Sequence, residues 1–151
     1  NIEIVFDDAA IGNQTLAYRH RDGSFAAELA SARTFCQLRD VELMKNAGLA
    51  LGGSLDNAVV VDDGKILNDG GLRMEREFVR HKALDCLGDL LLLGMPVKAK
   101  MTAHRPGHAL STKLVQALLN DPRAFKTVEA GTSQSRSDSY VLPELAAAAT
   151  A

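Results

Sequence analysis

His81 and Asp85 stand four residues apart in a stretch, residues 78–90, whose spacing of apolar residues predicts a helix. At about 100° per residue, His81, Asp85 and Asp89 fall on one stripe of that helix, opposite a leucine-rich face. A histidine followed one turn later by a carboxylate puts a nitrogen and an oxygen ligand side by side, as a zinc site with an open position requires. An ordinary pair on a solvated helix face is the alternative that this spacing leaves open.

A second histidine, His108, follows Arg105, Pro106 and Gly107 at the predicted start of another helix. Backbone N–H groups and the positive end of the helix dipole favour anions at such a position. His108 is therefore a candidate for a catalytic role, and a capping or surface histidine is the alternative.

Two long helices that would carry these residues are predicted from apolar side chains that recur at helical spacing. The first covers residues 75–93 and ends at Gly94 and Pro96, because proline cannot continue a helix. The second covers residues 109–119. Between them, residues 97–102 alternate apolar and polar side chains and are predicted to form a strand.

The rest of the chain supplies strands and shorter helices. Residues 1–6 alternate as a strand of a sheet does. A short helix is expected after the turn at Gly23, with Ser24 as its N-cap. Its buried side is expected to hold Phe25, Leu29 and Ala32. Further extended segments are predicted at residues 14–19, 33–36, 58–61 and 65–68, and a further helix at residues 40–47.

These elements predict an α+β fold with two layers, in which two long helices lie on one face of a mostly antiparallel sheet. The chain has 151 residues, the size of one ordinary domain with its own core. Residues 131–151 are polar and then rich in alanine, and we expect them to form a mobile tail.

Composition excludes several classes of partner. Seventeen basic and nineteen acidic side chains give a net charge of -2, so neither nucleic acid nor an anionic membrane surface is expected as a partner. No apolar run approaches the ~20 residues of a transmembrane helix. Cys36 and Cys86 are far apart in sequence, which favours a reducing compartment and predicts a cytoplasmic protein. The chain begins at Asn1 directly on a strand pattern, as a piece of a longer chain would.

Four motifs carry a resemblance to a known family. They are Ser31-Ala32-Arg33-Thr34-Phe35, Gly-Leu-Ala-Leu-Gly-Gly-Ser at residues 48–54, the helix at residues 78–90, and Gly107-His108-Ala109-Leu110. In this order they closely resemble the UDP-3-O-acyl-N-acetylglucosamine deacetylases of lipid A biosynthesis in Gram-negative bacteria. The resemblance runs from Phe6 to about Phe125.

The resemblance implies a zinc-dependent amidase built from two similar α+β domains that sandwich their helices between two sheets. This chain corresponds to the second, C-terminal domain over residues 1–130, with a βαβ insert at about residues 36–64. The implied reaction hydrolyses the acetamide of UDP-3-O-acyl-N-acetylglucosamine and releases acetate, with Zn²⁺ as the cofactor.

The resemblance also assigns roles to single residues. His81 and Asp85 match two of three zinc ligands, which hold the metal and its nucleophilic water. His108 matches the histidine that stabilises the oxyanion and protonates the leaving amine, and Asp89 matches the carboxylate that orients it. Thr34 matches a threonine whose hydroxyl helps to hold the oxyanion.

Substrate contacts follow in the same way. Lys82 matches a substrate-contacting lysine, Phe6 lies where the family stacks the uracil ring, and Arg105 lies where a basic residue meets the diphosphate. The insert matches an apolar passage for the acyl chain. Its expected wall residues are Leu38, Val41, Ala50, Leu55, Ala58 and Val60.

The chain departs from the family at two places. The family's third zinc ligand is a histidine preceded by the glutamate that acts as general base, and no Glu-His pair occurs here. A missing N-terminal domain is therefore the expected partner, and this chain alone is expected to be inactive. Cys36 and Gln37 replace a glycine and an apolar aromatic residue. The alternatives are a non-catalytic paralogue that binds the UDP-sugar or a partner, and a purely structural domain.

Overall fold

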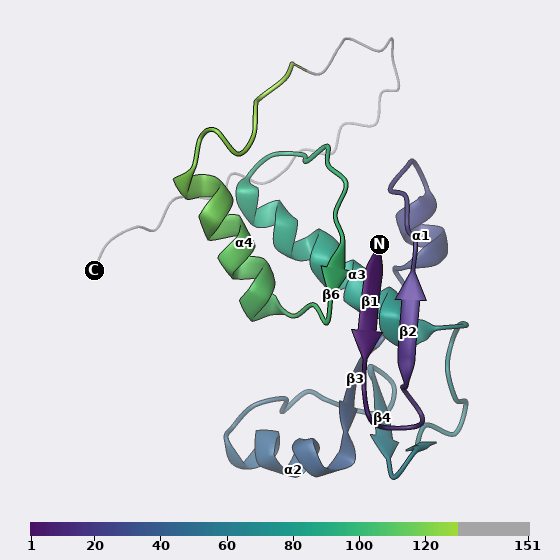
Figure 1. The fold of residues 1–151 in the computed structure, drawn as a ribbon. Coiled ribbons are helices and arrows are strands. Elements are labelled where there is room, and N and C mark those ends of the chain that lie inside the picture. Colours follow the sequence, from purple (N-terminus) through teal and green to yellow (C-terminus); the bar gives the residue numbers. More distant parts are fainter. Residues whose placement is uncertain (130–151) are drawn as a thin grey trace.

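Two small sheets and two long helices make up the computed structural model, which describes residues 1–129 (Figure 1). The elements in chain order are β1 Ile2–Val5, β2 Asn13–Leu16, α1 Ser24–Glu28, β3 Thr34–Gln37, α2 Leu38–Asn46, β4 Ala58–Asp62, β5 Lys65–Ile66, α3 Glu77–Leu90, the 3-10 helix η1 Leu91–Leu93, β6 Ala103–His104 and α4 His108–Asn120.

The first sheet has the strand order β2-β1-β6. Strand β1 pairs antiparallel with β2, Ile2 facing Leu16, and parallel with β6, Ile2 facing Ala103. Ile2 and Ile4 are buried while Glu3 between them is exposed, as the alternating sequence predicts.

The second sheet has the order β3-β4-β5 and contains the expected βαβ unit. Strands β3 and β4 are parallel and are joined across helix α2, whereas β4 and β5 are antiparallel. Val59 and Val61 of β4 are fully buried. The α+β class is confirmed, but each sheet combines one parallel and one antiparallel pair, so the prediction of a mostly antiparallel sheet is wrong. Parallel pairing follows from the helical crossover, which returns the chain in the same direction.

Helix α3 lies against the strands β1, β2 and β3, and α4 runs beside α3 and η1 (Figure 1). Phe78 and Val79 of α3 pack in one core with Ile4, Leu29 and Val59. The two long helices are therefore confirmed, with α3 as the helix that contacts the strands.

Helix α1 differs from its prediction. Gly23, in the left-handed conformation with φ 77°, is the N-cap in place of Ser24. Ser24 is instead buried, and its hydroxyl donates to the Arg21 carbonyl at 2.8 Å. Leu29 and Ala32 are buried as expected, but Phe25 is exposed. The three residues do not share one helical face, because α1 ends at Glu28 and Leu29 already lies in the turn that follows it.

The segment between the long helices also differs. Residues 97–102 form no strand, and only Ala103 and His104 pair with β1. Alternation makes a strand only where a partner edge is available, and the parallel pairing engages only Ile2 and Glu3. The expected mobile tail at residues 131–151 lies outside the described residues. Of the helices in the described part, none has the length and apolar character needed to cross a bilayer.

Candidate active site

His81 and Asp85 face each other across one turn of α3. Nε2 of the imidazole is 3.4 Å from Oδ1 of the carboxylate, and the two side chains are only 13% and 11% exposed. The solvated helix face that the spacing left open is therefore wrong for this pair. Lys82 donates from Nζ to the other oxygen, Oδ2, of Asp85 at 2.7 Å.

The second ring nitrogen of His81 is held by the backbone. Nδ1 lies 3.3 Å from the carbonyl oxygen of Ala32. Since a carbonyl oxygen only accepts, Nδ1 carries the hydrogen of this bond, and the neutral ring presents an Nε2 lone pair to Asp85. Burial lowers the pKa of His81, an effect that the Asp85 charge and the Ala32 carbonyl oppose without cancelling.

In that state two acceptors face each other, the Nε2 lone pair of His81 and the Oδ1 oxygen of Asp85. A cation between them would satisfy both, so these side chains fit a metal ion that accepts nitrogen and oxygen ligands. Within residues 1–129, no group of three His, Cys, Asp or Glu side chains is arranged to hold a metal. The pair thus offers two donors and leaves the remaining coordination positions open.

His108 and Asp89 form a second pair, between the start of α4 and the end of α3. Nδ1 of His108 donates to Oδ1 and Oδ2 of Asp89 at 3.0 and 3.1 Å. The imidazole is 68% exposed and the carboxylate 15% exposed. The contact expected between these two residues is present, and Nε2 of His108 remains available to another group.

The β3-α2-β4 unit encloses a largely apolar groove of about 740 Å³. All six residues expected in the acyl passage line it, namely Leu38, Val41, Ala50, Leu55, Ala58 and Val60. Thr34 and Cys36 line it as well. Phe35, also in the wall, connects the groove to α3, because its ring centroid lies 6.2 Å from that of His81 and 5.7 Å from Nζ of Lys82.

The remaining predicted residues are spread around this region. The ring of Phe6 packs edge to face on that of Phe35, with centroids 5.5 Å apart. Arg105 is exposed and adopts a left-handed backbone with φ 48° just before α4. The structure brings Lys82, Phe6 and Thr34 to the neighbourhood of Phe35, and it places Arg105 between β6 and α4.

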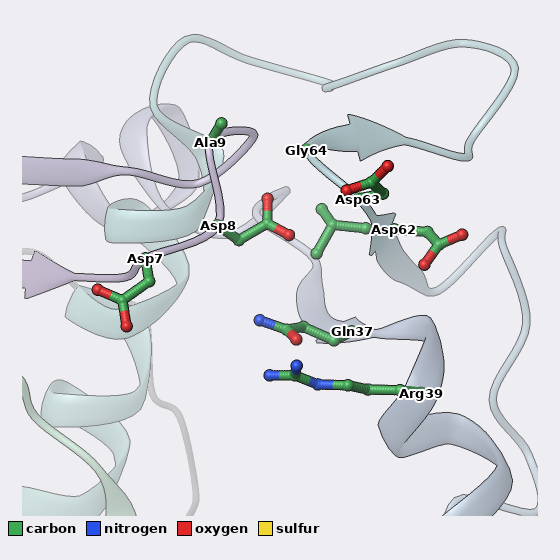
Figure 2. Close-up of a pocket in the computed structure, with 9 residues that line it drawn as sticks. Asp7, Asp8, Ala9, Gln37, Arg39, Asp62, Asp63 and Gly64 are labelled. Atoms are coloured by element: carbon green, nitrogen blue, oxygen red, sulfur yellow. The ribbon is translucent and has the colours of Figure 1, made fainter.

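A second hollow, of about 640 Å³, lies at the other end of β3. Figure 2 shows the side chains of Gln37 and Arg39 reaching into it opposite Asp8 and the turn at Asp63. No residue predicted for the site lines it. Four aspartates and one arginine make it a polar, solvated surface feature.

Sequence reasoning missed two residues that support the site, Arg33 and Glu77. Glu77 is fully buried in the first turn of α3 and forms an ion pair with Arg33, with Nε and Oε1 2.8 Å apart. The available signal was the helical stripe of His81 and Asp85, which, extended back by one turn, reaches Glu77.

The fold and the site together define a class. It is an α+β domain in which ionisable side chains converge beside an apolar groove, the arrangement expected of an enzyme or of a ligand-binding domain.

The chain belongs to the LpxC family, described as UDP-3-O-acyl N-acetylglycosamine deacetylase, whose family model matches residues 1–120. It is 52% identical over 123 residues to the UDP-3-O-acyl-N-acetylglucosamine deacetylase of Anaeromyxobacter sp. (strain Fw109-5), a match that covers 82% of this chain and 40% of the relative. The enzyme of the same name from Campylobacter hominis is 49% identical over 125 residues, 83% of this chain and 42% of the relative. The enzyme of the same name from Brucella ovis is 48% identical over 130 residues, a match that covers 85% of this chain and 46% of the relative. The chain thus spans less than half the length of these relatives.

Proposed function

We propose that this chain is the C-terminal part of a zinc-dependent amidase that hydrolyses the acetamide of UDP-3-O-acyl-N-acetylglucosamine and releases acetate. The observation that carries the proposal is the largely buried His81–Asp85 pair, two facing acceptors on one helix, in a chain about half identical to proteins named as this deacetylase.

His81 through Nε2 and Asp85 through Oδ1 would hold the zinc ion. Bound zinc supplies a Lewis acid and a water that ionises near neutral pH. Lys82 keeps Asp85 oriented and balances part of its charge through the 2.7 Å bond to Oδ2. The Ala32 carbonyl keeps the hydrogen of His81 on Nδ1 and so leaves Nε2 free for the metal.

His108 and Asp89 would act on the other side of the scissile amide. The carboxylate accepts from Nδ1–H and orients the imidazole, whose Nε2, when it carries a proton, would donate to the oxyanion and then to the leaving amine. Thr34 would add a second donor for the oxyanion. These roles assign proton transfer and charge stabilisation to groups held at fixed places on α3, β3 and α4.

The groove would receive the acyl chain of the substrate. Its aliphatic wall favours a hydrocarbon chain by about 0.8 kcal/mol for each buried methylene. Lys82 and Phe6, near Phe35, would contact the sugar nucleotide, and Arg105 would meet its diphosphate.

The proposal includes a companion N-terminal domain. That domain would supply the third zinc ligand and the general base, because no three His, Cys, Asp or Glu side chains within residues 1–129 are arranged to hold a metal. A cytoplasmic location belongs to the proposal, since the two cysteines are unpaired.

Metal content tests the proposal directly. In the full-length protein, His81→Ala or Asp85→Ala should remove most of the zinc measured by elemental analysis, and acetate release from the UDP-sugar should be lost with it. Lys65→Ala, a change at an exposed residue of β5 outside the groove, is the control and should keep both. A zinc-free protein that still binds the UDP-sugar would favour the non-catalytic alternative, and an isolated 151-residue chain with full activity would contradict the need for a companion domain.

A further inference from the structure

The segment of residues 32–34 is fixed to the start of α3 by one buried carboxylate. Both oxygens of Glu77 are engaged. Oε1 accepts from the backbone N–H of Arg33 at 2.9 Å and from its Nε at 2.8 Å, and Oε2 accepts from Nη2 of Arg33 at 3.0 Å. Oε2 also accepts from the backbone N–H of Arg73 at 2.7 Å. The carboxylate therefore receives four hydrogen bonds from two segments of backbone and one guanidinium.

Arg33 is buried too, and its geometry is specific. Its guanidinium fork meets the two oxygens of Glu77 side by side, and Nη2 also donates to the carbonyl of Gly71 at 2.8 Å. A fork of this kind fixes direction as well as distance, which a lysine ammonium cannot do. Burial acts to raise the pKa of Glu77, but the hydrogen bonds from Arg33 and Arg73 outweigh it and hold the pKa below its usual value.

The neighbours of this ion pair in the chain are site residues. Ala32, directly before Arg33, accepts from Nδ1 of His81 through its carbonyl oxygen. Thr34, directly after Arg33, lines the groove. Glu77 lies one turn before His81 on α3. The ion pair thus joins residues 32–34 to the first turn of α3, and Arg33 is the residue next to Ala32, whose carbonyl binds His81.

We propose that Arg33 and Glu77 form a positioning pair. By clamping residues 32–34 onto the first turn of α3, they keep the Ala32 carbonyl on Nδ1 of His81 and so hold the imidazole in the tautomer that turns the Nε2 lone pair toward Asp85. Neither residue touches the reacting atoms, so both act through His81. The proposal rests on the proposed function for its catalytic meaning, but the tautomer that it fixes is a property of the protein without metal or substrate.

A buried ion pair is weak evidence for a gain in stability, because desolvation of two charges offsets their attraction. We therefore assign this ion pair a role in positioning His81. Metal sites need their ligands held to within about 0.5 Å, and partners that fix a ligand histidine contribute 10–100-fold to metal affinity. The Arg33–Glu77 ion pair, next in the chain to the Ala32 carbonyl that binds His81, can hold the imidazole to this tolerance.

The first experiment measures the tautomer of His81 in the metal-free, full-length protein labelled with ¹⁵N-histidine. Long-range ¹H–¹⁵N spectra distinguish a protonated Nδ1 from a protonated Nε2, and the signals of His81 are identified by their absence in His81→Gln. We expect one tautomer, with the hydrogen on Nδ1, in the unaltered protein. Arg33→Met should give a mixture of both forms, and Arg33→Lys an intermediate result.

Arg73→Met is the matched control. It also removes a guanidinium from this region, one that donates to the Asp56 carbonyl, but it keeps the backbone N–H that binds Glu77. The control should keep the single tautomer. If Arg33→Met also keeps it, or if Arg73→Met loses it as well, the proposal is wrong. Should Arg33→Met fail to fold, Arg33→Lys, which keeps the charge, carries the same test.

The second experiment separates positioning from folding. In variants shown to be folded by circular dichroism, Arg33→Met and Arg33→Lys should bind zinc 10–100-fold more weakly and lower kcat with KM little changed, while Arg73→Met stays within about twofold. Unaltered zinc affinity and kcat in folded Arg33 variants would overturn the positioning role. If the unaltered protein releases no acetate, the proposed function fails, and the tautomer experiment still decides the positioning pair.

Discussion

Helices α3 and α4 lie against each other but are held in different ways. Helix α3 buries side chains from its first turn to its third, and they are Glu77, Phe78, Val79, Ala83 and Cys86. Helix α4, almost as long, buries only Val115. The positions of His81 and Asp85 are therefore fixed by packing within this chain. The imidazole of His108, by contrast, is mostly exposed and is held by its hydrogen bonds to Asp89.

Exposed leucines lie on α4 and on η1, the 3-10 helix that follows α3. The exposed residues are Leu91, Leu92, Leu110, Leu114 and Leu119. An apolar surface of this kind indicates an interface, and the proposed companion domain would cover it. The residues of α3 in the candidate site are thus positioned by packing within this chain, whereas α4 presents an exposed apolar surface that the proposed companion domain would cover.

The largest effect is expected at the buried carboxylate of α3. Glu77→Ala leaves the charge of Arg33 unpaired in the core, so the free energy of unfolding measured with urea should fall by about 3–5 kcal/mol. Glu75→Ala, which alters an exposed carboxylate two residues earlier, should change it by less than about 0.5 kcal/mol. A loss below about 1 kcal/mol for Glu77→Ala would show that packing of α3 does not depend on the pair.

A smaller effect concerns Cys86, also on the buried side of α3. Burial, with a contribution from the charges of Asp85 and Asp89, raises the pKa of its thiol to about 11. The unfolded chain loses this proton at lower pH, so stability is retained below the pKa of the unfolded thiol and declines as the pH rises toward 11. The loss amounts to about 2–3 kcal/mol, at roughly 1.4 kcal/mol per pKa unit.

Urea unfolding at a series of pH values between 8 and about 11 checks this expectation. Cys86→Ala should flatten the alkaline decline relative to the unaltered protein, while Cys36→Ala, at a half-buried thiol, should flatten it less. Parallel declines in the unaltered protein and Cys86→Ala would contradict the burial of this thiol.

The exposed side of α4 gives a third, smaller effect. If the companion domain covers Leu110, then Leu110→Ser in the full-length protein should lower the free energy of unfolding by about 1.5–3 kcal/mol, the range for burying such a side chain. Leu43→Ser, at an exposed leucine of α2, should cost less than about 0.5 kcal/mol. Equal effects of Leu110→Ser and Leu43→Ser would contradict the proposal that a companion domain covers the exposed leucines of α4.

The smallest effect is expected for the His108–Asp89 pair. With the imidazole largely in water, Asp89→Asn should change the free energy of unfolding by less than about 1 kcal/mol. The same change should reduce acetate release strongly, because Asp89 orients the imidazole that is proposed to serve the leaving amine. If Asp89→Asn lowered stability but left acetate release unchanged, the His108–Asp89 pair would have a structural role in place of the proposed catalytic one.

Local patterns predicted the elements that depend on local forces. The alternation of Ile2 and Ile4 predicted β1, and helical spacing predicted the ends of α4 to within one residue and those of α3 to within three. Residues 97–102 alternate equally well but find no partner edge, since pairing is decided by tertiary contacts. The six groove residues were predicted from the resemblance to the family, because no periodicity in the sequence links them.

Helical spacing could place Glu77 on the stripe of His81 and Asp85, but it could not identify the partner of Glu77. Arg33 and Glu77 are 44 residues apart, and a charged residue at the start of a helix is ordinarily solvated. Nor could spacing show that the Ala32 carbonyl binds His81, because the contact depends on how β3 approaches α3. The sequence revealed which residues carry ionisable groups, and the tertiary fold determined which of them are buried together.

The parallel pairing of β1 with β6 joins residues 101 positions apart, as in the contact between Glu3 and His104. During synthesis on the ribosome, β1 and β2 therefore emerge long before their third strand. A two-stranded ribbon is marginally stable in water, so the first sheet gains its stability only after α3 has been made and docked. The order of translation thus makes α3, with His81 and Asp85, available before the strand that completes the sheet against which it packs, whereas His108 is made only after that strand.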